Sequence, residues 1–199
     1  MSTRTTTIII LLMLLVGTVA GLLLWNRLPD QMASHWDIND QVNGYISKFW
    51  GVFLMPLIVL GMSVLFLTIP SIDPLKANIA KFRETFNLFV VLIVTFMLYI
   101  HGLTLAWNLG NTSFKMSTSM LPAMGLLFIF IGFLLRKAKR NFFIGIRTPW
   151  TLSSDYVWDK THQLGAILFM ISGVLAFIDR KSTRLNSSHI QKSRMPSSA

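Results

Sequence analysis

Four long runs of apolar residues without a charged side chain constrain this chain more than any other feature. A helix needs about 20 such residues to cross the hydrocarbon core of a membrane. The whole chain of 199 residues is 53% apolar and 13% charged, which is about half the charged fraction of an ordinary soluble domain. We therefore predict an all-α, polytopic membrane protein, and a soluble enzyme is disfavoured. The four runs, of 19, 21, 22 and 20 residues, are Thr7–Trp25, Phe49–Ile69, Phe86–Trp107 and Met116–Leu135.

A fifth apolar run, Leu164–Ile178, has only 15 residues. The segment that follows it, 179–199, is rich in Ser, Lys and Arg and resembles a translated sequencing-library adapter, so we exclude it from the native fold. The fifth span is then expected to be incomplete at its C-terminal end. Without this tail the net charge falls from +10 to +6. The alternative is a genuine disordered tail.

The distribution of Lys and Arg between the loops predicts the orientation. The N-terminus and the loops 70–85 and 136–163 together carry ten of these residues, whereas the loops 26–48 and 108–115 carry three. The side with more positive charge is cytoplasmic, so the N-terminus is expected inside the cell. Orientation and attraction to anionic lipid account for the basic charge, and we predict no direct binding to nucleic acid.

The loop 26–48 reads NRLPDQMASHWDINDQVNGYISK, in which Asn43-Gly44 is a strong turn signal. Its polar residues alternate as in a calcium loop, but no glutamate closes the pattern. Zinc would need more nitrogen or sulfur ligands, so we predict no metal site. Two interpretations stay open, a compact structural cap and a binding surface for an external ligand. The residues of that candidate ligand surface are Pro29, His35, Trp36, Gly44 and Tyr45.

The loop 70–85 has the pattern of a helix that lies at the membrane interface. Asp73 and Pro74 suit the start of a helix, and Leu75, Ile79 and Phe82 follow at helical spacing. We expect an amphipathic anchor that runs into the third span.

The loop 136–163 is the most informative segment. Gly145 permits a positive φ. Pro149 fixes its own φ, so the sequence around it is expected to form a rigid turn. Trp158 and His162 share one face of the helix expected next. The loop serves either as an anchor or as a docking surface on the cytoplasmic side. Neither an activated nucleophile nor an acid/base pair is apparent, so we predict no catalytic residue and no cofactor.

Few polar or small residues interrupt the spans. His101 lies near the outer end of the third span, where a neutral side chain bonded to a neighbouring helix and a proton relay are the alternatives. Two pairs of small residues, Gly17 with Gly21 and Gly102 with Ala106, suit close helix packing.

Two segments together resemble the SdpI immunity-protein family. The first is LPDQMASHWDINDQVNGYISK after the first span, which is similar to the family's N-terminal domain of unknown function. The second is NFFIGIRTPWTLSSDYVWDKTHQLG. Its matching positions, which the resemblance makes candidates for binding a partner, include Asn141, Gly145, Arg147, Thr148, Pro149, Trp150, Val157, Trp158, Thr161 and His162.

The resemblance implies a bacterial inner-membrane protein without cofactor or enzymatic reaction. It implies an N-terminal domain over 1–70, a membrane domain over 71–178, and a sixth span that this chain lacks. The founding member of the family protects its producer from a secreted peptide toxin, senses that toxin and sequesters a transcriptional repressor at the membrane. Two rival hypotheses are a small transporter and a membrane sensor without immunity.

Overall fold

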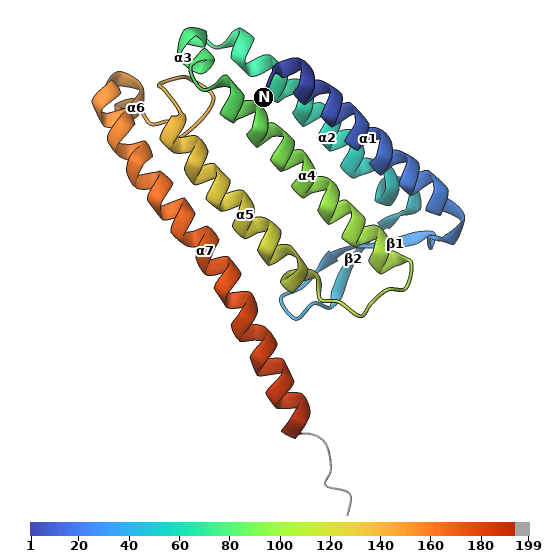
Figure 1. Cartoon of the computed structure of the whole chain (residues 1–199). Helices are drawn as coiled ribbons and strands as arrows, with labels where there is room; N and C mark the ends of the chain where they lie inside the picture. The colour runs from blue at the N-terminus through green and yellow to red at the C-terminus, as the bar shows by residue number, and fades with distance from the viewer. Residues whose placement is uncertain (194–199) are drawn as a thin grey trace, which may run out of the picture.

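A computed structural model describes the backbone of residues 1–193 and the side chains of residues 1–178. The protein is an all-α polytopic membrane protein, and five of the described helices are long and apolar enough to cross a membrane (Figure 1). The elements in chain order are α1 (Thr3–Leu24), η1 (Trp25–Arg27), β1 (Gln31–Trp36), β2 (Val42–Ser47), α2 (Lys48–Ile72), α3 (Lys76–Ala80), α4 (Arg83–Asn108), α5 (Met116–Lys137), α6 (Pro149–Ser153) and α7 (Asp155–Ser193).

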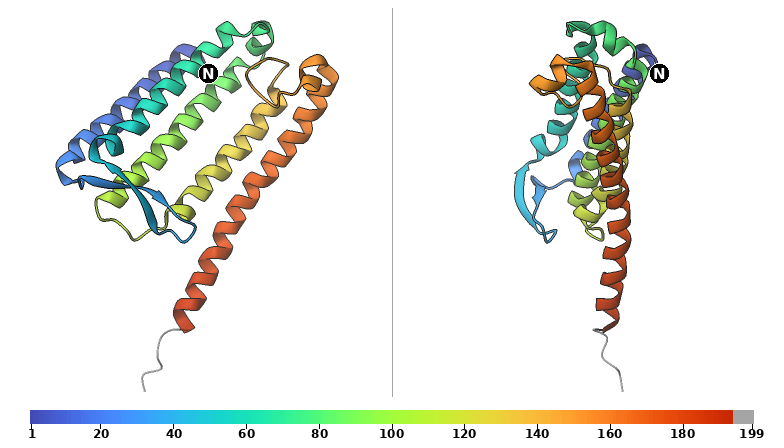
Figure 2. Two further views of the ribbon diagram at one scale, coloured as in Figure 1. Left: turned by 180° about the vertical axis from the view of Figure 1, so that it is seen from behind. Right: turned by 90° about the vertical axis from the view of Figure 1, so that its left-hand side faces the viewer.

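Helix α4 occupies the middle of the bundle and contacts α1, α2 and α5, whereas α7 packs along α5. Figure 2 shows the same order from behind and from the side. Phe86, Val90 and Val94 of α4 are buried together with Ile10 of α1 and Val59 of α2. Large apolar side chains cover the outer faces of the spans, as a surface in contact with lipid requires.

Glycines allow α5 and α7 to approach closely. A Cβ on Gly125 would lie 2.8 Å from the carbonyl oxygen of Gly173, and one on Gly132 would lie 2.6 Å from that of Ala166. The pair Gly17 and Gly21 lies against side chains of α4 and α2, as its spacing predicts. The prediction for Gly102 was wrong, because nothing lies within 4 Å of a Cβ there. A small-residue spacing does not reveal which face of a helix has a neighbour.

The fifth span is longer than its apolar run. Helix α7 begins at Asp155, so that residues 155–178 form a candidate span of 24 residues. The continuous apolar run left out the mixed turns before Leu164, which the helix includes. The incompleteness expected at the C-terminal end of this span stays a prediction. The helical backbone continues to Ser193, and the adapter origin of residues 179–199 stays a prediction.

A two-stranded antiparallel hairpin forms in the loop between α1 and α2. The chain reverses at residues 37–41, where one carboxylate oxygen of Asp37 accepts the N–H groups of Asn39 and Gln41, both at 2.8 Å. The turn predicted at Asn43-Gly44 was therefore misplaced, because both residues lie in β2. Gly44 pairs with His35, and a Cβ on Gly44 would lie 2.9 Å from the Cβ of His35. The glycine permits close strand pairing rather than a turn.

The helix expected over the loop 70–85 is divided into α3 and the first turn of α4. Leu75, not Asp73, is the residue before α3, and Ile79, Phe82 and Phe86 are buried in the main core. The apolar face of this segment packs against the other helices at this end of the bundle.

Candidate functional site

The connection between α5 and α7, residues 138–154, contains most of the residues singled out in the sequence, and we call it the signature loop. It lies at the same end of the bundle as the N-terminus and α3, opposite the hairpin (Figure 1). Backbone outside a regular helix must find other hydrogen-bond partners. In the signature loop, side chains supply many of them.

Asn141 organises the first part of the loop. Its Oδ1 accepts hydrogen bonds from the backbone N–H groups of Phe143 (2.9 Å) and Ile144 (2.6 Å). Its Nδ2 donates to the carbonyl oxygens of Lys139 and Ile144, both at 2.8 Å. The side chain is completely buried, and these four bonds use its full capacity of two donors and two acceptor lone pairs.

Gly145, Trp158 and His162 lock the loop onto α7. The imidazole of His162 stacks on the Trp158 ring with the centroids 3.9 Å apart. Its Nε2 accepts the N–H of Ile146 (3.0 Å), and its Nδ1 donates to the Trp158 carbonyl (2.8 Å). Both bonds together require the neutral imidazole with its proton on Nδ1. Gly145 has a φ of 116°, and a Cβ there would collide with Nε2 of His162, so glycine is needed for two reasons.

Trp158 also holds the end of α5. Its indole Nε1 donates to the carbonyl oxygen of Ala138 at 3.0 Å, and Ala138 is the C-cap residue that follows α5. The ring is 1% exposed. One buried side chain thus joins α5, α7 and the signature loop.

A capping box begins the short helix α6. Thr148 accepts the N–H of Thr151 (3.2 Å), and the Thr151 hydroxyl accepts the N–H of Thr148 (2.8 Å). Pro149 occupies the first turn, where its missing N–H costs nothing. The Thr151 hydroxyl also donates toward the Ile146 carbonyl (3.0 Å), which ties α6 to the preceding backbone.

Asp73 and Asn78 join the signature loop to the connection between α2 and α4. The two carboxylate oxygens of Asp73 accept the N–H groups of Leu75 (2.6 Å) and Phe142 (2.8 Å). Asn78 donates to the carbonyl oxygen of Arg140 (2.9 Å). The sequence assigned Asp73 to a helix cap, and no local signal identified a partner 69 residues away.

The residues resembling the family signature divide into a buried and an exposed set. Asn141, Trp158 and His162 are at most 2% exposed, and Thr148, Val157 and Thr161 are half-buried. The exposed set is Gly145, Arg147, Pro149 and Trp150, and we call the last three the loop surface. Trp150 is 72% exposed, and Arg147 donates to the Phe142 carbonyl at 2.7 Å.

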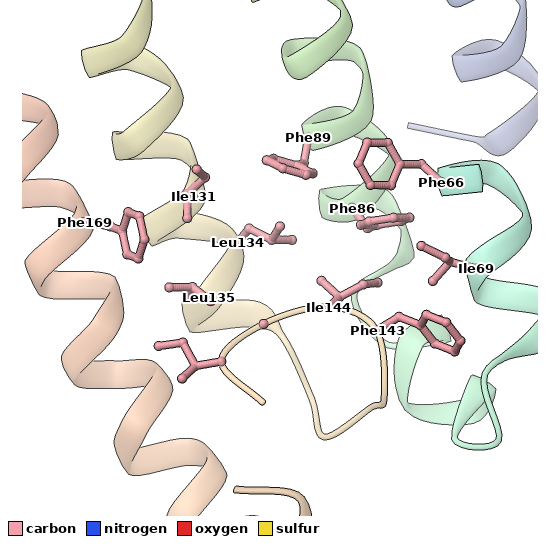
Figure 3. Close-up of a pocket in the computed structure, with 12 residues that line it drawn as sticks. Phe66, Ile69, Phe86, Phe89, Ile131, Leu134, Leu135, Phe143, Ile144 and Phe169 are labelled. Atoms are coloured by element: carbon pink, nitrogen blue, oxygen red, sulfur yellow. The ribbon is translucent and has the colours of Figure 1, made fainter. Parts of the chain in front are cut away.

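The inner edge of the signature loop closes an apolar cavity of about 300 Å³ (Figure 3). Side chains from α2, α4, α5 and α7 form its other walls. Phe143 and Ile144 point into it from the loop, opposite Phe86 and Phe89 of α4. The cavity is suited to an apolar group rather than to polar chemistry. Its lining residues are Phe66, Ile69, Phe86, Phe89, Ile131, Leu134, Leu135, Phe143, Ile144, Gly145, Ile146 and Phe169.

The candidate external surface lies on and beside the hairpin. Pro29, His35 and Tyr45 are exposed, and Trp36 and Gly44 are half-buried. The residues do not form one cluster, since Pro29 precedes β1 while the other four lie in the paired strands.

Two long-range contacts that the sequence analysis missed fix the hairpin to the spans. The side-chain amide of Asn108, the last residue of α4, accepts the N–H of Ala33 (2.7 Å) and donates to its carbonyl (3.0 Å). The carboxylate of Asp40 accepts the N–H (2.8 Å) and hydroxyl (2.6 Å) of Ser117 in the first turn of α5. Asp40 therefore caps α5 from a distant segment.

A second cavity of about 350 Å³ lies between the hairpin and the ends of α4 and α5. The carboxylates of Asp37 and Asp40 line it together with Trp36 and the methionines Met55 and Met120. Within residues 1–178, no three His, Asp or Glu side chains are arranged to hold a metal ion.

His101 does not form the interhelical hydrogen bond expected of it. It is 3% exposed, and its Nε2 has no partner among the described side chains and backbone. A proton relay through His101 would need a hydrogen-bonded neighbour, and the described residues provide none at its Nε2.

Comparisons with known proteins confirm the resemblance deduced from the sequence. The model of the SdpI/YfhL protein family matches residues 137–191, and that of a domain of unknown function, DUF1648, matches residues 9–60. Immunity protein SdpI of Bacillus subtilis (strain 168) is 24% identical over 172 residues, which cover 84% of this chain and 78% of that protein. No solved structure matches the chain significantly.

Replacing Asn141 with Ala should destabilise the signature loop. The substitution leaves the buried N–H groups of Phe143 and Ile144 without partners, at an expected cost of about 2–3 kcal/mol. Thermal unfolding of the purified protein in detergent measures this cost. Asn111→Ala is the control, since Asn111 lies in an exposed loop and its side chain bonds only to Ser113 among the described residues. Equal unfolding temperatures for the two variants would refute the central role of Asn141.

Proposed function

We propose that this chain is a membrane immunity protein that protects a bacterial cell from a secreted peptide toxin. The observation that carries the proposal is the similarity to Immunity protein SdpI, which extends over most of both chains. Similarity of that extent is not explained by one shared motif. No catalytic step and no cofactor form part of this function.

The proposed orientation places the hairpin outside the cell and the signature loop in the cytoplasm. The unequal distribution of Lys and Arg supports it, with ten residues on one side and three on the other. The N-terminus, α3 and α6 lie at one end of the bundle (Figure 1). The membrane is then the bacterial inner membrane.

Single cysteines test this orientation directly, because the chain contains no cysteine. In intact cells, a maleimide that cannot cross membranes should label Ile38→Cys and leave Trp150→Cys unlabelled until the cells are permeabilised. Both positions are well exposed, at 97% and 72%, so access to reagent rather than burial decides the result. Labelling of Trp150→Cys alone would reverse the orientation.

The hairpin is the proposed site of contact with the toxin. The cavity beside it combines apolar walls with the carboxylates of Asp37 and Asp40, which favours an apolar peptide that carries positive charge. Tyr45 is 61% exposed on the same hairpin. An exposed aromatic ring supplies a large contact area at low entropic cost.

Replacing Tyr45 with Ala should weaken protection without affecting the fold. Loss of an aromatic anchor at an interface costs about 1–2 kcal/mol, so we expect the toxin concentration that kills half of the cells to fall about 5-fold to 30-fold. The measurement is survival of a sensitive bacterium that expresses the chain and is challenged with the peptide. Tyr156→Ala is the matched control, since Tyr156 is 73% exposed at the opposite end of the bundle. Absence of protection by the unaltered chain against every related peptide tested would contradict the proposed function.

We also propose that toxin contact is coupled to recruitment of a cytoplasmic regulator. Helix α5 supports the coupling because it is held at both ends. Asp40 of the hairpin caps its first turn, and Trp158 donates a hydrogen bond to the carbonyl of Ala138, the residue directly after its last turn. A toxin shifts the loop only if it binds two arrangements of this helix unequally.

The loop surface is the proposed docking site for that regulator. Arg and Trp are enriched among residues that dominate binding energies, and Arg147 and Trp150 are both exposed there. The buried residues of the signature would then hold the loop in shape rather than touch the partner.

Replacing Trp150 with Ala should release the regulator from the membrane fraction while survival against the toxin stays unchanged. Co-purification from detergent extracts, followed by mass spectrometry, measures retention of the partner. Trp50→Ala is the control, because Trp50 is 49% exposed in the first turn of α2 at the hairpin end. Equal recovery of the same partner with both variants would exclude the loop surface as its docking site.

A further inference from the structure

A polar pocket lies where three of the spans meet at the signature-loop end of the bundle. It has a volume of about 410 Å³ and is lined by Thr3, Pro70, Lys76, Ala80 and Arg83. These residues come from the first turn of α1, the last turn of α2, the short helix α3 and the first turn of α4. The pocket is separate from both the loop surface and the hairpin.

The pocket contains two cations that lack a counterion. Neither Lys76 nor Arg83 forms an ion pair with a carboxylate in the part of the chain whose side chains are described. The neighbouring acid, Glu84, lies 3.7 Å from the α-amino group of Met1 instead. Lys76 is exposed, whereas Arg83 is partly buried. A partly buried charge without a partner is costly, so Arg83 is the cation that most needs an anion.

Hydrogen-bond donors in the pocket are also unused. The Nε of Arg83 is shielded from solvent and has no acceptor within the described residues. The Thr3 hydroxyl accepts a hydrogen bond from Asn87 (3.3 Å), which leaves its own proton available. A guanidinium, an ammonium and a hydroxyl together match the oxygens of a phosphate group.

The position of the pocket along the membrane normal identifies the source of that phosphate. Thr3 begins α1, Arg83 begins α4, and Pro70 lies two residues before Ile72, which ends α2. Three apolar spans therefore stop at this level, where the hydrocarbon core gives way to the lipid head groups. Basic pockets between spans at this depth are suited to anionic head groups.

We propose that this pocket binds the phosphate group of an anionic membrane lipid. Lys76 and Arg83 hold the phosphate, and the acyl chains lie along the apolar ends of α1 and α2. The bound lipid supplies the missing counterion and ties α1, α3 and α4 together. This site goes beyond the immunity function and does not depend on it.

The test measures lipid binding to the complete chain purified in detergent. Native mass spectrometry counts bound phosphatidylglycerol, and thermal unfolding is followed with added phosphatidylglycerol, phosphatidylcholine or inorganic phosphate. We expect phosphatidylglycerol to bind and to raise the unfolding temperature. Each cation removed should weaken binding about 5-fold, so that the double variant Lys76→Gln, Arg83→Gln binds about 25-fold more weakly.

Matched variants separate this site from general charge attraction. Arg136→Gln, Lys137→Gln removes one Arg and one Lys at the end of α5, at the same end of the bundle, and should leave binding unchanged. Lys76→Arg, Arg83→Lys keeps both charges and should retain binding, which also shows that the region tolerates substitution. Equal loss in both Gln double variants, or equal binding of phosphatidylcholine, would overturn the proposal. The same stabilisation with inorganic phosphate alone would overturn the assignment to a lipid.

Discussion

The hydrocarbon core offers no water to an unpaired backbone group, and this constraint organises the whole protein. Each span satisfies its N–H and C=O groups within a helix, so all non-helical backbone is confined to the two ends of the bundle. There the chain relies on side chains with several hydrogen-bonding atoms. Asn141 and Asp73 satisfy backbone groups at one end, and Asn108 and Asp40 do so at the other. These polar contacts determine the shapes of the surfaces that the protein presents to either side of the membrane.

The two ends are built differently although they use the same chemistry. At the signature-loop end, most side-chain bonds lie within one loop, which Trp158 and His162 lock onto α7. Asp73 and Asn78 add bonds to it from the connection between α2 and α4. At the other end, a separate hairpin is attached to α4 and α5 by bonds between distant segments. Helix α5 is joined to both structures.

A recognisable motif does not by itself mark a contact surface. The residues GIRTPW and the Trp-His pair after them resemble the family signature as one unit, yet the fold separates them. Gly145 is required by its positive φ and by the imidazole of His162, and Asn141 by four backbone hydrogen bonds. Arg147 and Trp150 remain on the outside. Residues that hold the scaffold and residues that face outward are thus mixed along a short stretch of chain.

The sequence by itself determined four of the five described spans, because a charge-free run of about 20 residues has one stable solution in a membrane. It also determined the family resemblance and marked Gly145 as a position where a positive φ is permitted, and the structure then showed that glycine is required there. Only the tertiary structure decided where Asp40 and Asp73 bond, since their partners are 77 and 69 residues away and local spacing holds no record of such contacts. The same reason explains the misplaced turn at Asn43-Gly44, where the local signal for a turn is outweighed by the strand pairing with His35. Likewise, Arg147 is exposed and His162 of α7 is buried because of the way the signature loop packs against α7. No pattern within the loop specifies that packing.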